Sequence, residues 1–142
     1  GDGEETEALR AQIQRLGLND AVRFIGHVKA RYGFSKGSLL VVPSRGDSMP
    51  YVVIEAAAAG IPMVAANVGG IPEIFGSHTD ALFAPNIVAA MADAIEIALE
   101  DPAAALERAK SLRERIFLHF SQKAMVEGVL AGYRDALAAP RI

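Results

Sequence analysis

Short apolar runs that alternate with helix-forming segments constrain the fold of this chain more than any other feature. The runs cover residues 21–26, 39–42, 62–66 and 81–84, and each is rich in β-branched, aromatic or aliphatic residues. Such runs are typical of buried strands, and parallel strands need long crossover connections, which are usually helices. The alternation therefore predicts an α/β fold, a mostly parallel sheet with helices on both faces.

Helix signals fill the gaps between the runs and continue to the C-terminus. Gly17 and Gly60 are placed to end two of these helices, Asn86 to cap a third, and Asp101-Pro102 to start a fourth. Three of the predicted helices cover residues 4–16, 29–35 and 50–59. Two more begin near 69–73 and after 86, and a final pair, divided near 118–121, covers about 102–138. Two of them carry apolar stripes, formed by Val88, Met91, Ile95 and Leu99, and by Met125, Val126, Val129, Leu130, Tyr133 and Leu137.

The composition is that of an ordinary globular domain, and it excludes several classes of site. The chain has 142 residues, of which 51% are hydrophobic and 22% are charged, enough for one domain with its own core. It contains no cysteine, which excludes thiolate metal sites, disulfides and cysteine nucleophiles. Its 14 Lys and Arg against 17 Asp and Glu give a net charge of -3, which argues against a nucleic-acid partner.

The longest nearly apolar stretch, residues 49–66, does not read as a membrane span. It is too short and contains Glu55, Gly60 and Pro62. The chain opens with Gly-Asp-Gly-Glu-Glu instead of a basic stretch leading into an apolar run, so no signal peptide is predicted. It also lacks an initiator Met. We therefore expect a piece of a longer cytoplasmic protein, with membrane contact at most peripheral, at the inner face.

Three loops lie where ligands of open parallel α/β sheets bind, outside the carboxyl ends of the strands. They are residues 26–28, 43–50 and 67–72. Gly26 and His27 directly follow the first predicted strand, which makes them candidates for binding. The other two loops contain most of the unusual residues of the chain, and we expect the main site there.

The segment Gly69-Gly70-Ile71-Pro72 follows a predicted strand and opens a helix. Free backbone N–H groups and the positive end of a helix would stabilise an anion there, and two glycines allow a phosphate to approach the backbone closely. Pro72 suits the first helical turn because its missing N–H costs nothing. A tight turn that needs glycine for its geometry alone explains the same residues, so both interpretations stay open.

Two acidic residues, Asp47 and Glu55, are separated by seven residues. Glu55 lies about a turn and a half inside the helix over 50–59, in an otherwise apolar run. A carboxylate can hold two hydroxyls of one sugar, as in dinucleotide folds, and an acid alone in such a run is expected to be partnered or to face a site. The alternatives are that Asp47 or Ser48 caps the helix and that Glu55 is a solvated surface residue.

Other chemistries find little support in the sequence. His27, His78 and His119 lack the spacing of metal ligands, and no carboxylate cluster suggests a two-metal centre, so no metal site is expected. No serine lies in a Gly-x-Ser-x-Gly elbow, which argues against a serine hydrolase. We expect each histidine to be structural or exposed.

The order of these motifs resembles one protein family. The chain is similar, in order and spacing, to the C-terminal domain of retaining family-four glycosyltransferases, the GT-B group often called glycosyl transferase group one. The resemblance covers nearly all of the chain and implies the Rossmann-like C-terminal half of a GT-B fold, one nucleotide-sugar-binding domain over residues 1–142, with the N-terminal acceptor domain absent. It is carried by Gly1-Asp2-Gly3, Val22 to Val28, Val42-Pro43-Ser44, Pro50 to Ala56, Gly60 to Ala66 and Gly69 to Glu73.

The resemblance also implies roles for individual residues. Asp47 and Glu55 match the family's acidic pair, the catalytic residues: Glu55 would hold the ribose hydroxyls of the donor nucleotide, and Asp47 would contact the donor sugar. The family usually has Glu at the position of Asp47, and a glycine-rich, aromatic turn where this chain has Ser48-Met49-Pro50. Gly69 and Gly70 match the turn that approaches the diphosphate. The remaining donor-binding residues implied are Gly26, His27, Ser48, Met49, Tyr51 and Ile71.

The activity implied by the resemblance is transfer of a sugar from a nucleoside diphosphate sugar to a glycan or lipid-linked acceptor, with retention of configuration and without metal or other cofactor, as in polysaccharide biosynthesis. The family's phosphate-binding Arg and Lys lie upstream of Gly1, so this segment alone is expected to be inactive. Two other functions stay open, a non-catalytic nucleotide-binding or regulatory module and half of a non-hydrolysing sugar-nucleotide epimerase.

Overall fold

The chain divides into two compact units, Gly1–Lys36 and Gly37–Ile142. The computed structural model describes residues 3–138, so Gly1 and Asp2 of the first matching motif lie outside the described residues. The sheet belongs entirely to the second unit. The expectation of one nucleotide-sugar-binding domain over residues 1–142 stays a prediction.

The N-terminal unit contains two of the predicted helices, α1 (Thr6–Arg15) and α2 (Ala30–Phe34). Gly17 ends α1 with φ 68°, a backbone conformation that glycine adopts without strain. The prediction of a strand over 21–26 is wrong, because the segment has no strand structure. A strand forms only by pairing with a neighbour, and residues 3–36 contain no other strand, so an apolar composition alone does not produce one.

The other three predicted strands form a parallel sheet in the second unit, in the order β1 (Leu40–Val42), β2 (Met63–Ala66) and β3 (Leu82–Phe83). Val41 lies opposite Val64 in the register of β1 and β2. The central strand β2 is buried along its whole length. Because the strands run in the same direction, the loops that follow them leave the sheet at one edge.

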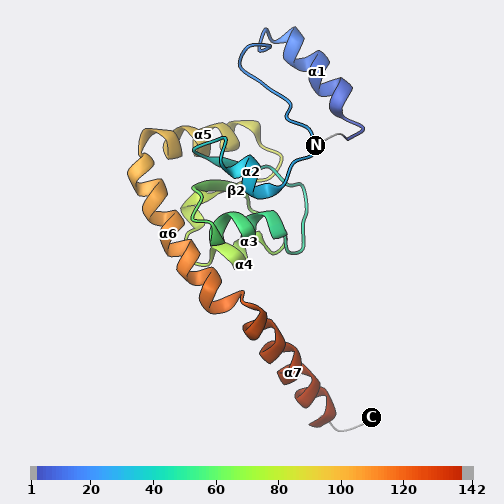
Figure 1. Ribbon diagram of the computed structural model, residues 1–142, viewed down its shortest axis with the longest axis vertical. Helices are drawn as coiled ribbons and strands as arrows, with labels where there is room; N and C mark the ends of the chain where they lie inside the picture. The colour runs from blue at the N-terminus through green and yellow to red at the C-terminus, as the bar shows by residue number, and fades with distance from the viewer. Residues whose placement is uncertain (1–2, 139–142) are drawn as a thin grey trace. The chain divides into compact units, whose positions relative to one another are not determined.

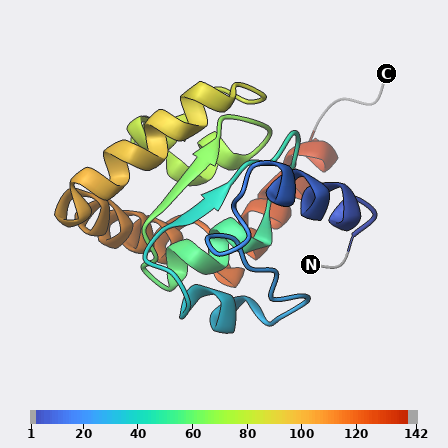
Figure 2. The ribbon, with the colours of Figure 1, turned by 90° about the horizontal axis from the view of Figure 1, so that it is seen from above.

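Helices cover both faces of the sheet, as predicted. Seen from above in Figure 2, the strands lie inside a shell of helices. One face is covered by α5 (Val88–Glu100), which packs over β2 and β3. Val64, Ala66 and Phe83 of the sheet and Ala98 of α5 form a buried cluster there. This cluster fixes α5 on its face by apolar burial.

The opposite face is covered by α3 (Tyr51–Ala58) and α4 (Ile71–Phe75), so that β2 lies between these helices and α5 (Figure 1). The long helix α6 (Pro102–His119) packs against α3 and closes this side of the unit. The sheet therefore has a core on each face. The buried residues on this side are Val53, Ala56, Ala57, Ile71, Ile74, Phe75, Ala105, Ala109, Leu112 and Ile116.

The start of α5 differs from the prediction. Ile87, not Asn86, occupies the N-cap position, and no side chain caps the helix. Asn86 adopts φ 59°, a left-handed conformation that Asn tolerates better than most residues, so it ends the preceding loop instead of opening the helix. Of the predicted apolar stripe, Met91 and Ile95 pack against the core, whereas Val88 and Leu99 are exposed.

A side chain of α6 holds the end of α4. Arg115 donates from Nε to the Ile74 carbonyl at 3.1 Å and from Nη2 to the Glu73 carbonyl at 3.0 Å. The last carbonyls of any helix lack partners within the helix, so Arg115 supplies what α4 cannot. Gly76 leaves room for the guanidinium, because a Cβ there would lie only 2.7 Å from its central carbon.

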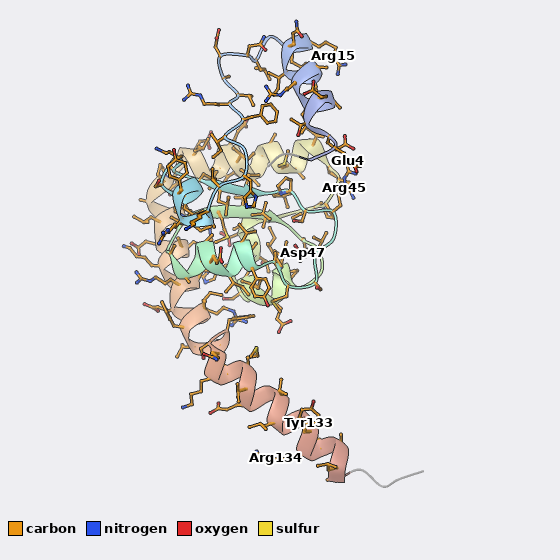
Figure 3. The ribbon with its side chains drawn as sticks, turned by 45° about the vertical axis from the view of Figure 1, so that its right-hand side comes forward. Glu4, Arg15, Arg45, Asp47, Tyr133 and Arg134 are labelled. Atoms are coloured by element: carbon orange, nitrogen blue, oxygen red, sulfur yellow. The ribbon has the colours of Figure 1, made fainter. Side chains whose placement is uncertain are left out.

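The last helix, α7 (Gln122–Ala138), begins after Ser121 as predicted. The Ser121 Oγ accepts a hydrogen bond from the Ala124 N–H at 3.2 Å. No residue of α7 is buried, and the predicted apolar stripe is exposed along its length; Tyr133 is labelled in Figure 3. None of the helices within residues 3–138 combines the length and apolarity needed to cross a bilayer.

Replacing Asp101 with alanine is expected to lower the free energy of unfolding by about 1 kcal/mol, because it removes a helix cap. The Asp101 carboxylate accepts a hydrogen bond from the Ala104 N–H at 2.9 Å, at the start of α6 where the sequence places it. Urea unfolding followed by circular dichroism measures the change. Asp93→Ala is the control, because Asp93 is exposed in the middle of α5. Equal losses in both variants would contradict the capping role.

Candidate functional site

The candidate site lies in the second unit, at the carboxyl ends of β1 and β2. The loop 43–50 leads from β1 into α3, and the loop 67–70 leads from β2 into α4. Figure 3 shows Arg45 and Asp47 on the first of these loops. Because β1 and β2 are parallel neighbours, both loops leave the sheet at the same edge, where open α/β sheets bind ligands.

The two loops are in direct contact through backbone atoms. The Gly70 N–H donates to the Asp47 carbonyl at 3.1 Å. A Cβ on Gly69 would lie 1.8 Å from the Asp47 carbonyl oxygen, and a Cβ on Gly70 would lie 2.0 Å from the Ser48 carbonyl oxygen. A side chain at either glycine would therefore force the loops apart. One of the two interpretations left open by the sequence was that the turn needs glycine for its geometry. The structure shows this need, and its cause is the neighbouring loop.

The Asp47 carboxylate turns back onto its own loop. Its Oδ1 accepts a hydrogen bond from the Met49 N–H at 3.3 Å, a bond typical of aspartate in turns. Pro50 occupies the N-cap position of α3 and no side chain caps that helix, so the alternative that Asp47 or the exposed Ser48 caps it is wrong. Within residues 3–138, Oδ2 of Asp47 makes no hydrogen bond, which leaves one carboxylate oxygen for a ligand.

Glu55 lies on the exposed side of α3. Val53, Ala56 and Ala57 are fully buried, so the core side of the helix lies elsewhere and the Glu55 carboxylate stays in solvent. No hydrogen bond or ion pair of the described chain involves this side chain, so it has no partner there. Tyr51, in the first turn of the same helix, is 79% exposed. Both side chains are accessible to a ligand, and the solvated alternative for Glu55 stays open.

A cavity of about 260 Å³ opens at the carboxyl ends of all three strands. Arg45 is its charged lining residue, and it takes part in no ion pair within the described chain. Sequence reasoning did not single out Arg45, although its place between β1 and Asp47 at the ligand-binding edge was a usable signal. The lining residues come from the strand ends and the start of α5, and they are Pro43, Arg45, Ala66, Phe83, Asn86, Ile87, Val88 and Met91.

The other predicted donor-binding residues are distributed over both units. Gly26 and His27 belong to the N-terminal unit, where Gly26 has φ 67° and His27 is exposed. Ile71 begins α4 with a fully buried side chain, and its N–H donates to the Val68 carbonyl at 3.1 Å. Neither its side chain nor its N–H is therefore available to a ligand. The donor-binding roles of these residues stay predictions.

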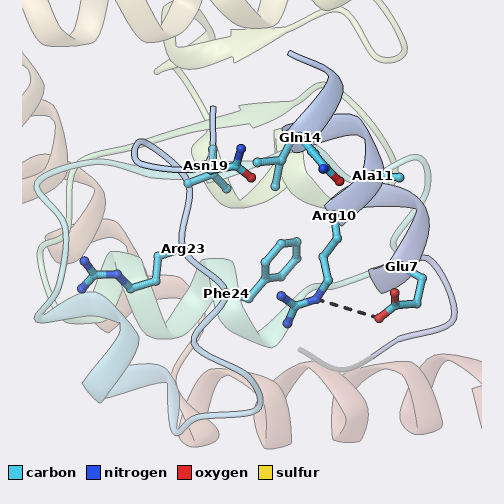
Figure 4. Close-up of a pocket in the computed structure, with 9 residues that line it drawn as sticks. Glu7, Arg10, Ala11, Gln14, Asn19, Arg23 and Phe24 are labelled. Atoms are coloured by element: carbon cyan, nitrogen blue, oxygen red, sulfur yellow. Dashed lines mark ion pairs between the residues drawn. The ribbon is translucent and has the colours of Figure 1, made fainter. Parts of the chain in front are cut away.

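A second hollow, of about 520 Å³, lies within the N-terminal unit (Figure 4). Arg10 of α1 lies over the Phe24 ring, 4.7 Å from its centroid, and pairs with Glu7 at 3.9 Å. Figure 4 shows Arg23 pointing away from these three side chains. The Arg10 guanidinium in the hollow is thus already engaged by a ring and a carboxylate.

The histidines have structural or exposed positions, as predicted. His78 Nε2 lies 3.0 Å from Ser111 Oγ and so links the segment after α4 to α6, whereas His27 and His119 are exposed. No group of three or more side chains suited to hold a metal ion occurs among residues 3–138. A reaction without a metal or other cofactor stays a prediction.

The chain is similar in sequence to several known proteins. A model of the family described as Glycosyl transferases group 1 matches residues 1–101. Glycogen synthase from Mycobacterium tuberculosis is 33% identical over 145 residues, which cover 99% of this chain and 34% of that protein. D-inositol 3-phosphate glycosyltransferase from Streptomyces avermitilis is 39% identical over 101 residues, which cover 68% of this chain and 22% of that protein. The chain thus spans about a third or less of these relatives.

Two solved structures share the fold. Sucrose-phosphate synthase from Thermosynechococcus elongatus matches with a TM-score of 0.81 at 33% identity, over 99% of this chain and 36% of that one. The C-terminal domain of a glycosyl transferase group 1 family protein from Francisella tularensis matches with a TM-score of 0.73 at 17% identity, over 85% of this chain and 66% of that one. The second match concerns the fold alone.

Proposed function

The chain belongs to the glycosyl transferases group 1 family and has the fold of the C-terminal half of a GT-B protein, and from this premise we propose that it binds the donor in a sugar-transfer reaction. The donor is a nucleoside diphosphate sugar, and the sugar passes to an acceptor with retention of its anomeric configuration, without a metal ion. The relatives support sugar transfer in general, since one is named glycogen synthase and another D-inositol 3-phosphate glycosyltransferase.

The contact between the loops 43–50 and 67–70 carries this proposal. It brings an acidic residue, Asp47, against the turn that enters α4, at the edge where open α/β sheets bind nucleotides. In the proposed site, Asp47 accepts hydrogen bonds from hydroxyls of the donor sugar through Oδ2, because Oδ1 is bonded to the Met49 N–H. Glu55, exposed and without a partner in the described chain, accepts bonds from the ribose hydroxyls.

In the proposed site, these carboxylates orient the donor, and they do not bind the diphosphate, which is the leaving group. As the bond between the sugar and the diphosphate breaks, negative charge grows on the diphosphate, and fixed N–H groups and cations stabilise it. Tyr51 and the backbone around Ser48 and Met49 complete the donor contacts of the second unit.

The rest of the reaction belongs to a larger protein. The chain covers 34% of the glycogen synthase and 36% of the sucrose-phosphate synthase. In the proposed arrangement a further, N-terminal domain of the same protein supplies the acceptor site and the cations that bind the diphosphate, so this segment alone is inactive. The acceptor is a glycan or a lipid-linked glycan in the cytoplasm, which a peripheral contact with the membrane would make accessible.

An amide NMR titration of the chain with UDP, GDP and ADP tests the donor assignment. We expect one of the three nucleotides to bind, with shifts concentrated at residues 47–55 and 67–73 and lost in Glu55→Ala. If none of them shifts these amides at millimolar concentration, in this chain or in the full-length protein, the donor assignment is overturned. If the full-length protein binds a nucleotide but transfers no sugar, a non-catalytic nucleotide-binding module replaces the proposed enzyme.

A further inference from the structure

We propose that Gly69 and Gly70 act as positioning residues, which hold the Asp47 carboxylate in place for the donor sugar, and that the Gly70 N–H is not a ligand of the diphosphate. This inference rests on the proposed function, in which Asp47 contacts the donor sugar. It differs from the role that the family resemblance implies for the two glycines. Its basis is the contact of the loops 43–50 and 67–70, in which backbone meets backbone.

Most amide groups of the turn 67–71 are already used within the chain. An N–H that donates to a carbonyl of the protein is not free to donate to a phosphate. Pro72 has no N–H at all, and α4 is a helix of only 5 residues. The bonds, at 2.8 to 3.1 Å, run from Asn67 to the Phe83 carbonyl, Val68 to Ala66, Gly70 to Asp47 and Ile71 to Val68.

The acidic loop fills the space that side chains would need at both glycines. The nearest atoms to a Cβ at these positions are carbonyl oxygens, 1.8 Å away for Gly69 and 2.0 Å away for Gly70. Backbone atoms cannot rotate aside as the end of a flexible side chain can. The absence of side chains at Gly69 and Gly70 therefore sets how closely the backbone of Asp47 and Ser48 approaches the turn.

The position of the Asp47 carboxylate follows from two contacts. The Gly70 N–H holds the backbone carbonyl of Asp47 at 3.1 Å, and the Met49 N–H holds Oδ1 at 3.3 Å. Together they direct Oδ2 without contacting it. Small displacements of a group that orients a substrate reduce the rate strongly, so a shift of this loop would weaken donor-sugar contacts while the nucleotide contacts remain.

A double-mutant cycle in the full-length protein tests the inference. Gly70→Ala and Asp47→Ala are each expected to lower kcat/KM for sugar transfer about tenfold or more. Each variant disrupts the hydrogen bond between a hydroxyl of the donor sugar and the charged Asp47 carboxylate, the first by displacing the carboxylate and the second by removing it. The double variant is expected to lie within about twofold of Asp47→Ala, because Gly70 acts only through that carboxylate. The Kd of the free nucleoside diphosphate, measured with UDP, GDP and ADP, is expected to stay within about twofold in Gly70→Ala.

Gly46→Ala is the matched control in the same loop, because a Cβ at Gly46 meets nothing within 4 Å. It is expected to leave kcat/KM unchanged. If the losses multiply in the double variant, or if Gly70→Ala weakens nucleoside diphosphate binding as much as transfer, the positioning role is overturned while Asp47 remains a donor ligand. If Asp47→Ala transfers sugar normally, the proposed function of Asp47 is overturned and the positioning role falls with it.

The unmodified protein provides a second test that does not depend on the folding of Gly70→Ala. In amide NMR, the Gly70 N–H is expected to exchange slowly with solvent, and equally slowly when UDP, GDP or ADP is added, because it donates to the Asp47 carbonyl in both cases. Rapid exchange of the Gly70 N–H without nucleotide, or exchange that becomes markedly slower on adding one, would overturn the inference.

Discussion

Replacing Glu55 with alanine is expected to lower kcat/KM for sugar transfer about a hundredfold and to leave the fold unchanged. Two hydrogen bonds from ribose hydroxyls to a carboxylate contribute about 3 kcal/mol together, which corresponds to roughly that factor. The side chain is exposed and makes no hydrogen bond or ion pair within residues 3–138, so the free energy of unfolding is expected to change by no more than about 0.5 kcal/mol.

Steady-state kinetics of the full-length protein, with urea unfolding of the same preparation, measures both quantities. Glu96→Ala is the matched control, because Glu96 is likewise an exposed glutamate inside a helix, α5, and has no assigned role. Glu55→Gln is expected to fall between wild type and Glu55→Ala, since the amide still accepts a hydrogen bond but carries no charge. Normal transfer by Glu55→Ala would show that the carboxylate is a solvated surface group.

Replacing Phe75 with alanine is expected to have the largest effect on stability, a loss of about 3–5 kcal/mol in the free energy of unfolding. Phe75 is fully buried at the end of α4, beside the equally buried Ile71 and Ile74. The loss combines the transfer of a ring out of water with the cavity that it leaves. Because the free energy of unfolding of a folded domain is about 5–15 kcal/mol in total, this variant is expected to unfold at low urea concentration.

Phe117→Ala provides the comparison for Phe75. Phe117 lies on α6 with 60% of its surface exposed, and its one described partner is the Arg113 guanidinium, 5.7 Å from the ring centroid. Phe117→Ala is expected to lower the free energy of unfolding by less than about 1 kcal/mol. Similar midpoints of urea unfolding for the two variants would mean that the side of the sheet with α3, α4 and α6 contributes little to stability.

The strands of the second unit could be predicted because their residues are apolar on both sides. Leu40–Val42 and Met63–Ala66 lie between two layers of helices, the first partly buried and the second fully, and such strands read as short continuous apolar runs. The run over 21–26 is also rich in apolar residues, although it contains Arg23, and it forms no strand. Pairing depends on a neighbour distant in the sequence, and composition does not reveal whether that neighbour is present.

The location of the candidate site could also be predicted, because the rule for parallel sheets needs only the order of strands and helices. The contact between its loops could not be predicted. Gly69 and Gly70 signal an unusual backbone, but the sequence does not show that the atoms beside them belong to Asp47 and Ser48. The place of Arg45 in the loop after β1 was a usable signal, but only the structure shows the cavity that this residue lines.

The bond between Arg115 and the end of α4 has a consequence for the order of events during protein synthesis. Arg115 and Ile74 are 41 residues apart, and ribosomes add about 5–20 residues per second. Ile74 near the end of α4 therefore leaves the ribosome roughly 2–8 seconds before the side chain that holds its carbonyl, and the turn at Gly69 and Gly70 leaves earlier still. Until α6 has emerged, the last carbonyls of α4 lack the hydrogen bonds that Arg115 donates. The apolar side of α6, against which this part of the core packs, is also absent. The loops 43–50 and 67–70 consequently reach their final positions late, although their own residues are made early.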